Sequence, residues 1–225
     1  MRHRPSPKEI LLGVIILFIG FVFEYVDTYV LGATGPTGSD VFPPSIAQWD
    51  ASLLLSINPG LLNPILNVFF ALITHIGSTL AIVVLCVVLY WAGYRREAVL
   101  IFATVVIGTL VVAPLKLVIL RPRPYSTFSA VVPLDTESGS SFPSGHSERI
   151  FALAAVFPTK KSWTTLTLYL LAVVVAFSRI YVGVHYPLDV AVGILIGFVI
   201  GKVTLRFQER VLSVAKRVGG MFGLK

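Results

Sequence analysis

Charged residues are scarce in this chain of 225 residues. They make up 13% of the sequence, about half of the roughly 25% that is usual in a soluble domain. Hydrophobic residues make up 56%, and the mean hydropathy is +0.86. These values exclude an ordinary soluble domain and a disordered chain, and they predict a membrane protein.

Cysteine is almost absent, because Cys86 is the single one and stands inside an apolar run. One cysteine excludes a disulfide scaffold and a zinc module, and it says nothing about the redox compartment. The net charge of +7 and the pI near 9.7 could indicate a nucleic-acid partner. The basic residues, however, stand at the ends of hydrophobic runs rather than on one polar face, so we exclude nucleic acid.

Long hydrophobic runs predict an all-α, polytopic membrane protein with six transmembrane helices in a single domain, residues 1–225. The predicted spans are Ile10–Leu31, Ile65–Tyr94, Ala98–Leu120, Ile150–Phe157, Trp163–Tyr181 and Pro187–Phe207. The first run lacks a small-residue cleavage site, so we predict a retained span rather than a signal peptide. Residues 32–63 form a predicted loop, with a short amphipathic stretch, Ile46–Leu55, at the membrane interface.

The basic residues predict the orientation, because Lys and Arg accumulate on the cytoplasmic side of membrane proteins. Thirteen of the eighteen fall on one side, namely Arg2, Arg4, Lys8, Arg95, Arg96, Lys160, Lys161, Lys202, Arg206, Arg210, Lys216, Arg217 and Lys225. The loop 32–63 contains Asp40 and Asp50 but no Lys or Arg. We therefore expect both termini to be cytoplasmic and this loop to lie outside the cell membrane.

The five remaining basic residues fall near the predicted outer ends of spans three, four and five. They are Lys116, Arg121, Arg123, Arg149 and Arg179. An ionisable side chain at membrane depth is costly unless it is paired or functional. Four acids are candidate partners: Glu24, Asp27, Glu148 and Asp189. Because the cations outnumber these acids, we favour a bound anion as the explanation.

Three segments carry polar residues to this predicted outer face. In Lys116–Pro124, the prolines end a helix one turn after Lys116. In Phe142–Ser147, a Ser-Gly pair leads into a helix and leaves backbone N–H groups free to bind an anion beside His146. In Ser178–Asp189, Asp189 follows His185 by four residues, close enough to accept its ring N–H.

Each segment also has a plain explanation when it is taken alone. Lys or Arg before Pro commonly ends a span, Ser is a common helix N-cap, and an acid in a first turn complements the helix dipole. Together, however, the segments combine two histidines, a carboxylate, several cations and a helix N-terminus. These are the components of phosphoryl transfer.

The sequence resembles the type 2 phosphatidic acid phosphatases, or lipid phosphate phosphatases, in three motifs that span about a third of the chain. The motifs stand here as Lys116 with Arg123-Pro124, as Pro143-Ser144-Gly145-His146, and as Ser178-Arg179 with His185 and Asp189. The resemblance implies that His185 forms a phosphohistidine, that Asp189 orients it, and that His146 protonates the leaving oxygen. It also implies that the phosphate is held by Lys116, Arg123, Ser144, the Gly145 backbone and Arg179.

Two further cations lie outside the fixed positions of the motifs. We predict a supporting role for Arg121. Glu148-Arg149 stands where the family usually has small residues, so Arg149 pairs either with Glu148 or an acid of the first span, or with a second phosphate of the substrate. We expect no metal and no cofactor, because Asp189 is the one carboxylate placed beside the phosphate and the histidines lack further zinc ligands.

The sequence thus predicts a phosphatase with an outward-facing site that acts on a lipid phosphate in the bilayer. The favoured substrate is a polyprenyl diphosphate, and the alternatives are phosphatidylglycerophosphate or phosphatidic acid. A phosphotransferase could use the same phosphohistidine. A transporter or scramblase predicts repeated halves and broken helices at the midplane, and the sequence indicates neither. The oligomeric state is left open.

Overall fold

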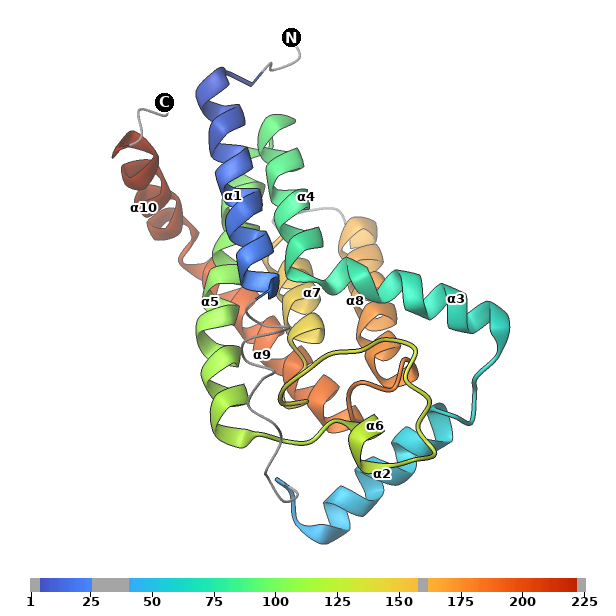
Figure 1. Ribbon diagram of the computed structural model, residues 1–225. Helices are drawn as coiled ribbons and strands as arrows, with labels where there is room; N and C mark the ends of the chain where they lie inside the picture. Colours follow the sequence, from blue (N-terminus) through green and yellow to red (C-terminus); the bar gives the residue numbers. More distant parts are fainter. Residues whose placement is uncertain (1–4, 26–40, 158–161, 222–225) are drawn as a thin grey trace.

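The computed structural model describes residues 5–25, 41–157 and 162–221, and all regular structure within these ranges is helical (Figure 1). The predicted all-α class is confirmed. The helices are α1 (Pro7–Tyr25), α2 (Pro44–Ile57), α3 (Pro64–Ile73), the 3-10 helix η2 (Thr74–Gly77), α4 (Thr79–Trp91), α5 (Arg95–Ile119), α6 (Pro124–Thr127), α7 (Gly145–Val156), α8 (Ser162–Tyr181), α9 (Pro187–Arg206) and α10 (Gln208–Met221).

Some expectations concern positions outside the described residues. They involve Arg2, Arg4, Asp27, Asp40, Lys160, Lys161, Lys225 and the side chain of Glu24.

Several helices are long and apolar enough to cross a membrane. Three segments of the described chain meet this condition: Arg95–Thr127, Ser162–Tyr181 and Pro187–Arg206. The bent pair formed by Pro64–Gly77 and Thr79–Trp91 adds a fourth span if it is counted as one. The helix α7 has 12 residues and is about 18 Å long, which is less than the roughly 30 Å of a bilayer core. The total of six spans therefore stays a prediction.

The second predicted span, Ile65–Tyr94, is divided into α3, η2 and α4 and is not one straight helix. The chain bends by 60° between α3 and α4. The Ser78 hydroxyl accepts a hydrogen bond from Ala81 N at 3.1 Å and so begins α4 anew. A Cβ atom on Gly77 would lie 3.0 Å from Val175 and 3.2 Å from His146. At the break, Gly77 therefore packs closely against α7 and α8, which carry motif residues. This packing accounts for the break without a transport function.

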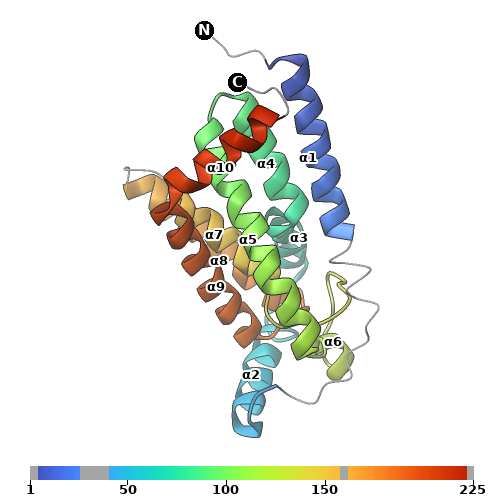
Figure 2. The same cartoon turned by 90° about the vertical axis from the view of Figure 1, so that its left-hand side faces the viewer.

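The central helix of the fold is α7, whose residues are all buried. The helices α5, α8 and α9 pack around it (Figures 1 and 2). Its contact with α9 is close because Gly193, Gly197 and Gly201 recur every four residues along one face of α9. A Cβ on Gly193 would lie 2.5 Å from Ser144 O, and one on Gly197 would overlap Glu148 O. Small residues at this spacing let two helix backbones approach each other.

The two ends of the bundle have different compositions. At one end, Arg95 pairs with Glu9, and Arg96 donates to Gln208 Oε1 at 2.6 Å, so the starts of α1, α5 and α10 lie together. The opposite end holds α2, α6 and the starts of α7 and α9 (Figure 1). The motif residues gather at this second end.

We expect Gly197→Ala to destabilise the protein by about 1–3 kcal/mol, the usual cost of overpacking, because the added methyl group would overlap the Glu148 carbonyl oxygen. The midpoint of thermal unfolding in detergent measures this effect. Gly220→Ala on α10 is the matched control, since a Cβ there meets nothing within 4 Å, and Ala favours a helix over Gly. An unchanged midpoint in Gly197→Ala would contradict the close contact between α7 and α9.

Candidate active site

Four helix ends bring the three motifs together at one end of the bundle. The last turns of α5 and α8 carry Lys116 and Arg179, and the first turns of α7 and α9 carry His146 and Asp189. All eight residues that the motifs select are buried: Lys116, Arg123, Ser144, Gly145, His146, Arg179, His185 and Asp189. The supporting residues Arg121 and Arg149 are buried as well.

His185 lies in the turn between α8 and α9, and its two ring nitrogens face different groups. Nδ1 is 3.5 Å from Asp189 Oδ2, while Nε2 is 3.4 Å from Arg123 Nη1. A proton on Nδ1, facing the carboxylate, leaves the Nε2 lone pair directed at the cations. The distance to Asp189 is longer than an ordinary hydrogen bond.

His146 is held by the cap of α7. Ser144 is the N-cap residue, and its hydroxyl accepts from Ser147 Oγ at 2.9 Å. Ser144 N donates to Asp189 O at 3.0 Å, which ties the start of α7 to the start of α9. This bond fixes the helix of one histidine relative to the carboxylate that faces the other.

Two guanidinium groups are anchored by backbone and side-chain acceptors. Arg123 donates to Val184 O at 3.1 Å and to Ser138 O at 2.9 Å. Arg179 donates to Thr74 Oγ1 at 2.5 Å. Because these contacts use only part of each guanidinium, both can also bind an anion between them.

That position is occupied by the carboxylate of Glu137, a residue that the sequence analysis did not select. Arg179 Nη2 pairs with its Oε1, and Arg123 Nη1 lies 2.9 Å from its Oε2. His146 Nδ1 is 3.3 Å from Oε1, and His185 Nε2 is 3.5 Å from Oε2. One carboxylate therefore contacts both arginines and both histidines of the motifs.

The charge of Glu137 follows from these contacts. Burial alone raises the pKa of a carboxyl group, but the positive charges of Arg179 and Arg123 outweigh it and hold the pKa of Glu137 well below its usual range. Because the group stays ionised at neutral pH, it acts as an anion in the site. A phosphate that binds Arg123 and Arg179 through the same atoms requires Glu137 to move away.

The predicted excess of cations over acids at this end of the bundle was wrong. Three further acids, Asp50, Asp135 and Glu137, pair with the cations. Arg121 pairs with Asp50 at 2.7 Å and with Asp189 at 2.5 Å, and Arg179 pairs with Asp135 at 3.1 Å. Asp135 and Glu137 lie in the loop between the first two motifs, and Asp50 lies on α2, outside the motif region. None of them stands at a fixed spacing from a motif residue that would have indicated its pairing.

Arg149 lies beside His146. Its Nε donates to Gly77 O at 3.1 Å, and its Nη2 is 3.4 Å from His146 Nδ1. Glu148 extends toward α5, where a Cβ on Gly108 would overlap its carboxylate. Arg149 is therefore placed at the edge of the anion position nearest to His146.

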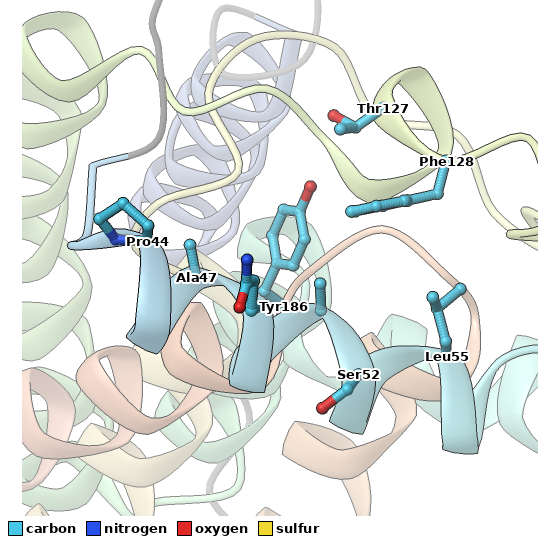
Figure 3. A pocket seen from close by; sticks show the side chains of 9 residues that line it. Pro44, Ala47, Ser52, Leu55, Thr127, Phe128 and Tyr186 are labelled. Carbon is cyan, nitrogen blue, oxygen red and sulfur yellow. The ribbon is translucent and has the colours of Figure 1, made fainter.

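A cavity of about 350 Å³ lies beside the cluster, between α2 and the chain after α6 (Figure 3). Ala47, Leu55 and Phe128 are among its lining residues, and Tyr186 forms one of its walls. The Tyr186 ring also packs on Arg121, 3.8 Å from the guanidinium carbon. The carboxylate of Glu137 occupies the position between Arg123 and Arg179, and neither arginine lines this cavity.

The donors in the cluster suit an anion. Guanidinium groups, imidazole rings and a helix N-terminus all bind phosphate oxygens. Within residues 5–25, 41–157 and 162–221, no group of three or more His, Cys, Asp or Glu side chains is arranged to hold a metal ion. The expectation that no metal takes part stays a prediction.

We expect Glu137→Gln to tighten the binding of inorganic phosphate by about tenfold, or about 1.4 kcal/mol, because the amide removes the competing charge. Calorimetric titration of the detergent-solubilised protein measures this. Glu209→Gln on α10 removes an exposed carboxylate and is the control. Weaker phosphate binding in Glu137→Gln would show that the carboxylate assists the anion rather than competing with it.

Comparisons with known proteins agree with this geometry. The sequence pattern of the PAP2 superfamily matches residues 97–212, which include all three motifs. A stretch of 60 residues is 47% identical to the putative undecaprenyl-diphosphatase YbjG of Escherichia coli and covers 26% of this chain but only 30% of YbjG. The undecaprenyl-diphosphatase BcrC of Bacillus subtilis is 29% identical over 65% of this chain and 77% of BcrC.

A solved structure shows the same fold. It is a PAP2-type phosphatidylglycerolphosphate phosphatase from Bacillus subtilis, which matches with a TM-score of 0.68 and 26% identity over 86% of this chain and 96% of that chain. The pattern match covers more than half of the sequence, and it includes the helix ends that form the anion site. The chain therefore belongs to the PAP2 superfamily, as do its phosphatase relatives from Bacillus subtilis.

Proposed function

We propose that the protein hydrolyses the terminal phosphate of a polyprenyl diphosphate in the membrane, through a phosphohistidine on His185. One observation carries the proposal. Both imidazoles face the same bound carboxylate, through different oxygens, while Arg123 and Arg179 hold it. A phosphate in that place would have a nucleophile and a proton donor in contact with it.

The reaction then follows in two steps. His185 Nε2 attacks phosphorus, the bond from phosphorus to the leaving oxygen breaks, and protonated His146 gives its proton to that oxygen. Neutral His146 next takes a proton from water, the hydroxide attacks the phosphohistidine, and inorganic phosphate leaves. Lys116, Arg123, Arg179 and the backbone N–H groups after Ser144 stabilise the phosphoryl oxygens in both steps.

The substrate assignment depends on Arg149. Because it adjoins His146, it lies on the side from which the leaving group departs in this mechanism. When a diphosphate is cleaved, the leaving group is itself a phosphate, and Arg149 can bind it. The undecaprenyl-diphosphatase names of YbjG and BcrC favour the same substrate class. The phosphatidylglycerolphosphate phosphatase with the similar structure favours a monoester instead. A phosphotransferase would need an acceptor in place of water.

The orientation belongs to this proposal as well. We propose six spans in the cell membrane, with both termini cytoplasmic and the site facing the outer side. The basic residues Arg95 and Arg96 at the start of α5 lie at the same end as the start of α1, and the motif residues lie at the other end. This separation supports the proposed orientation.

A quench experiment tests the phosphohistidine. After rapid mixing with a substrate labelled in its terminal phosphate, we expect label on wild type and none on His185→Ala. His146→Ala should retain label longer, since general acid–base catalysis contributes roughly 100-fold or more to each step. Label on His185→Ala protein would refute the assigned nucleophile.

A comparison of two lipid classes tests the role of Arg149. We expect Arg149→Ala to lower kcat/KM for a polyprenyl diphosphate by about tenfold more than for a phosphatidylglycerophosphate, or about 1.4 kcal/mol. Because kcat/KM for both lipids is measured on the same protein preparation, their ratio does not depend on the fraction of the variant that is folded. An equal loss on both lipids, or a wild type that prefers the glycerophospholipid by more than about tenfold, would exclude the diphosphate.

A further inference from the structure

A second buried network lies behind the catalytic pair, and it begins on α2. Asp50 is completely buried on this helix, whereas Ile46, Trp49 and Leu53 on its other face are exposed. The exposed apolar face fits the predicted interfacial location. Asp50 points inward to the site and is one of the buried residues of α2, with Ala47 and Leu54.

Both oxygens of Asp50 are bound. Oδ2 accepts from Arg121 Nη2 at 2.7 Å, and Oδ1 accepts from Leu188 N at 2.9 Å. Leu188 lies in the first turn of α9, next to Asp189. Asp50 therefore reaches Asp189 by two routes, through the backbone of α9 and through the Arg121 guanidinium.

Arg121 is held between two carboxylates and two aromatic rings. Nη1 donates to Asp189 Oδ1 at 2.5 Å, while Nη2 serves Asp50. The rings of Tyr186 and Phe42 lie 3.8 Å and 5.0 Å from its central carbon. A guanidinium in this setting is a rigid planar connector, because stacking and two charge-assisted bonds fix its orientation.

The remaining oxygen of Asp189 is thereby directed to the histidine. Oδ2 accepts from Tyr186 N at 2.9 Å and faces His185 Nδ1 at 3.5 Å. Without Asp50, the full positive charge of Arg121 would act on Asp189. It would weaken the attraction between the Asp189 carboxylate and the proton on His185. Because Asp50 partly neutralises the charge of Arg121, the attraction between the Asp189 carboxylate and the proton on His185 is weakened less.

We propose that Asp50, acting with Arg121, is a positioning residue for the Asp189–His185 pair. The proposal rests on the proposed role of His185 as nucleophile. It assigns a chemical task to α2, which lies outside the region matched by the family pattern, residues 97–212. It also gives Arg121 a task different from that of Arg123, since Arg121 binds acids of the protein and not the substrate.

Inorganic vanadate and phosphate are the probes, because they separate positioning of His185 from anion binding. Vanadate can take the imidazole as a fifth ligand, whereas phosphate stays tetrahedral and depends on the cations. We expect Asp50→Asn to weaken vanadate binding by about tenfold, or about 1.4 kcal/mol, and to change phosphate binding by less than about twofold. Calorimetry and the ⁵¹V NMR signal of bound vanadate measure this on the full chain in detergent.

Three further variants separate this role from a purely structural one. Arg121→Lys should have the same selective effect, since an ammonium is a point charge that cannot bridge both acids in the same plane. Glu209→Gln is the matched carboxylate-to-amide control and should change neither affinity. In an Asp189→Asn background, Asp50→Asn should cause no further loss of vanadate affinity, because the residue through which it acts is gone.

The opposite results would overturn the proposal. Equal losses of vanadate and phosphate affinity, or losses that add in the Asp50→Asn, Asp189→Asn double variant, would show a role in folding alone. If Asp50→Asn does not fold, Arg121→Lys decides by the same two affinities. Because binding of these anions needs no lipid turnover, a failure of the lipid assignment leaves the test intact. A wild type that binds neither anion would refute the anion site together with this proposal.

Discussion

The close contact of α7 with α9 is the constraint on which the site depends. Glycines on α9 allow the two backbones to approach so closely that Ser144 N–H reaches the Asp189 carbonyl oxygen. This single bond joins the start of one helix to the start of the other. His146 and the His185–Asp189 pair are therefore related through backbone geometry and not through flexible side chains, which fixes the relative positions of the two histidines.

The parts of the site that could be predicted from sequence are those with local signals. Ser144 before a helical run and Pro187 with Asp189 two residues later mark the two helix starts, because capping chemistry needs only neighbouring residues. The acids that balance the cations could not be found in this way. Asp50 and Arg121 are 71 residues apart, and their pairing depends on how α2 packs against the bundle.

The bend between α3 and α4 shows a different limit. The run Ile65–Tyr94 is apolar almost throughout, and apolar residues fit a straight span and a bent one equally well. Gly77 and Ser78 were the only local signs of a break, and each also occurs inside continuous helices. What decides the matter is the packing of Gly77 against His146 and Val175, which is information from a distant part of the chain.

Three of the buried cations, Arg121, Arg123 and Arg179, differ in their partners. Arg123 and Arg179 hold the carboxylate of Glu137 between them, whereas Arg121 is enclosed by Asp50 and Asp189. The division explains how a membrane-embedded protein can hold so many charges at one level. Arg121 is neutralised by two buried acids, whereas Arg123 and Arg179 share the carboxylate of Glu137, and Arg179 pairs with Asp135 as well.

The carboxylate of Glu137 affects the stability of the protein when no substrate is bound. A pocket of like charges is unstable when no anion is present, and a newly inserted chain has none at hand. An internal carboxylate allows the pocket to assemble and remain folded in its empty form. By thermodynamic linkage, the free energy by which Glu137 stabilises the empty pocket is subtracted from the binding free energy of any ligand that must displace its carboxylate. In the proposed reaction this lowers the affinity of the site for its product, so the residue that stabilises the empty protein would also favour the release of inorganic phosphate.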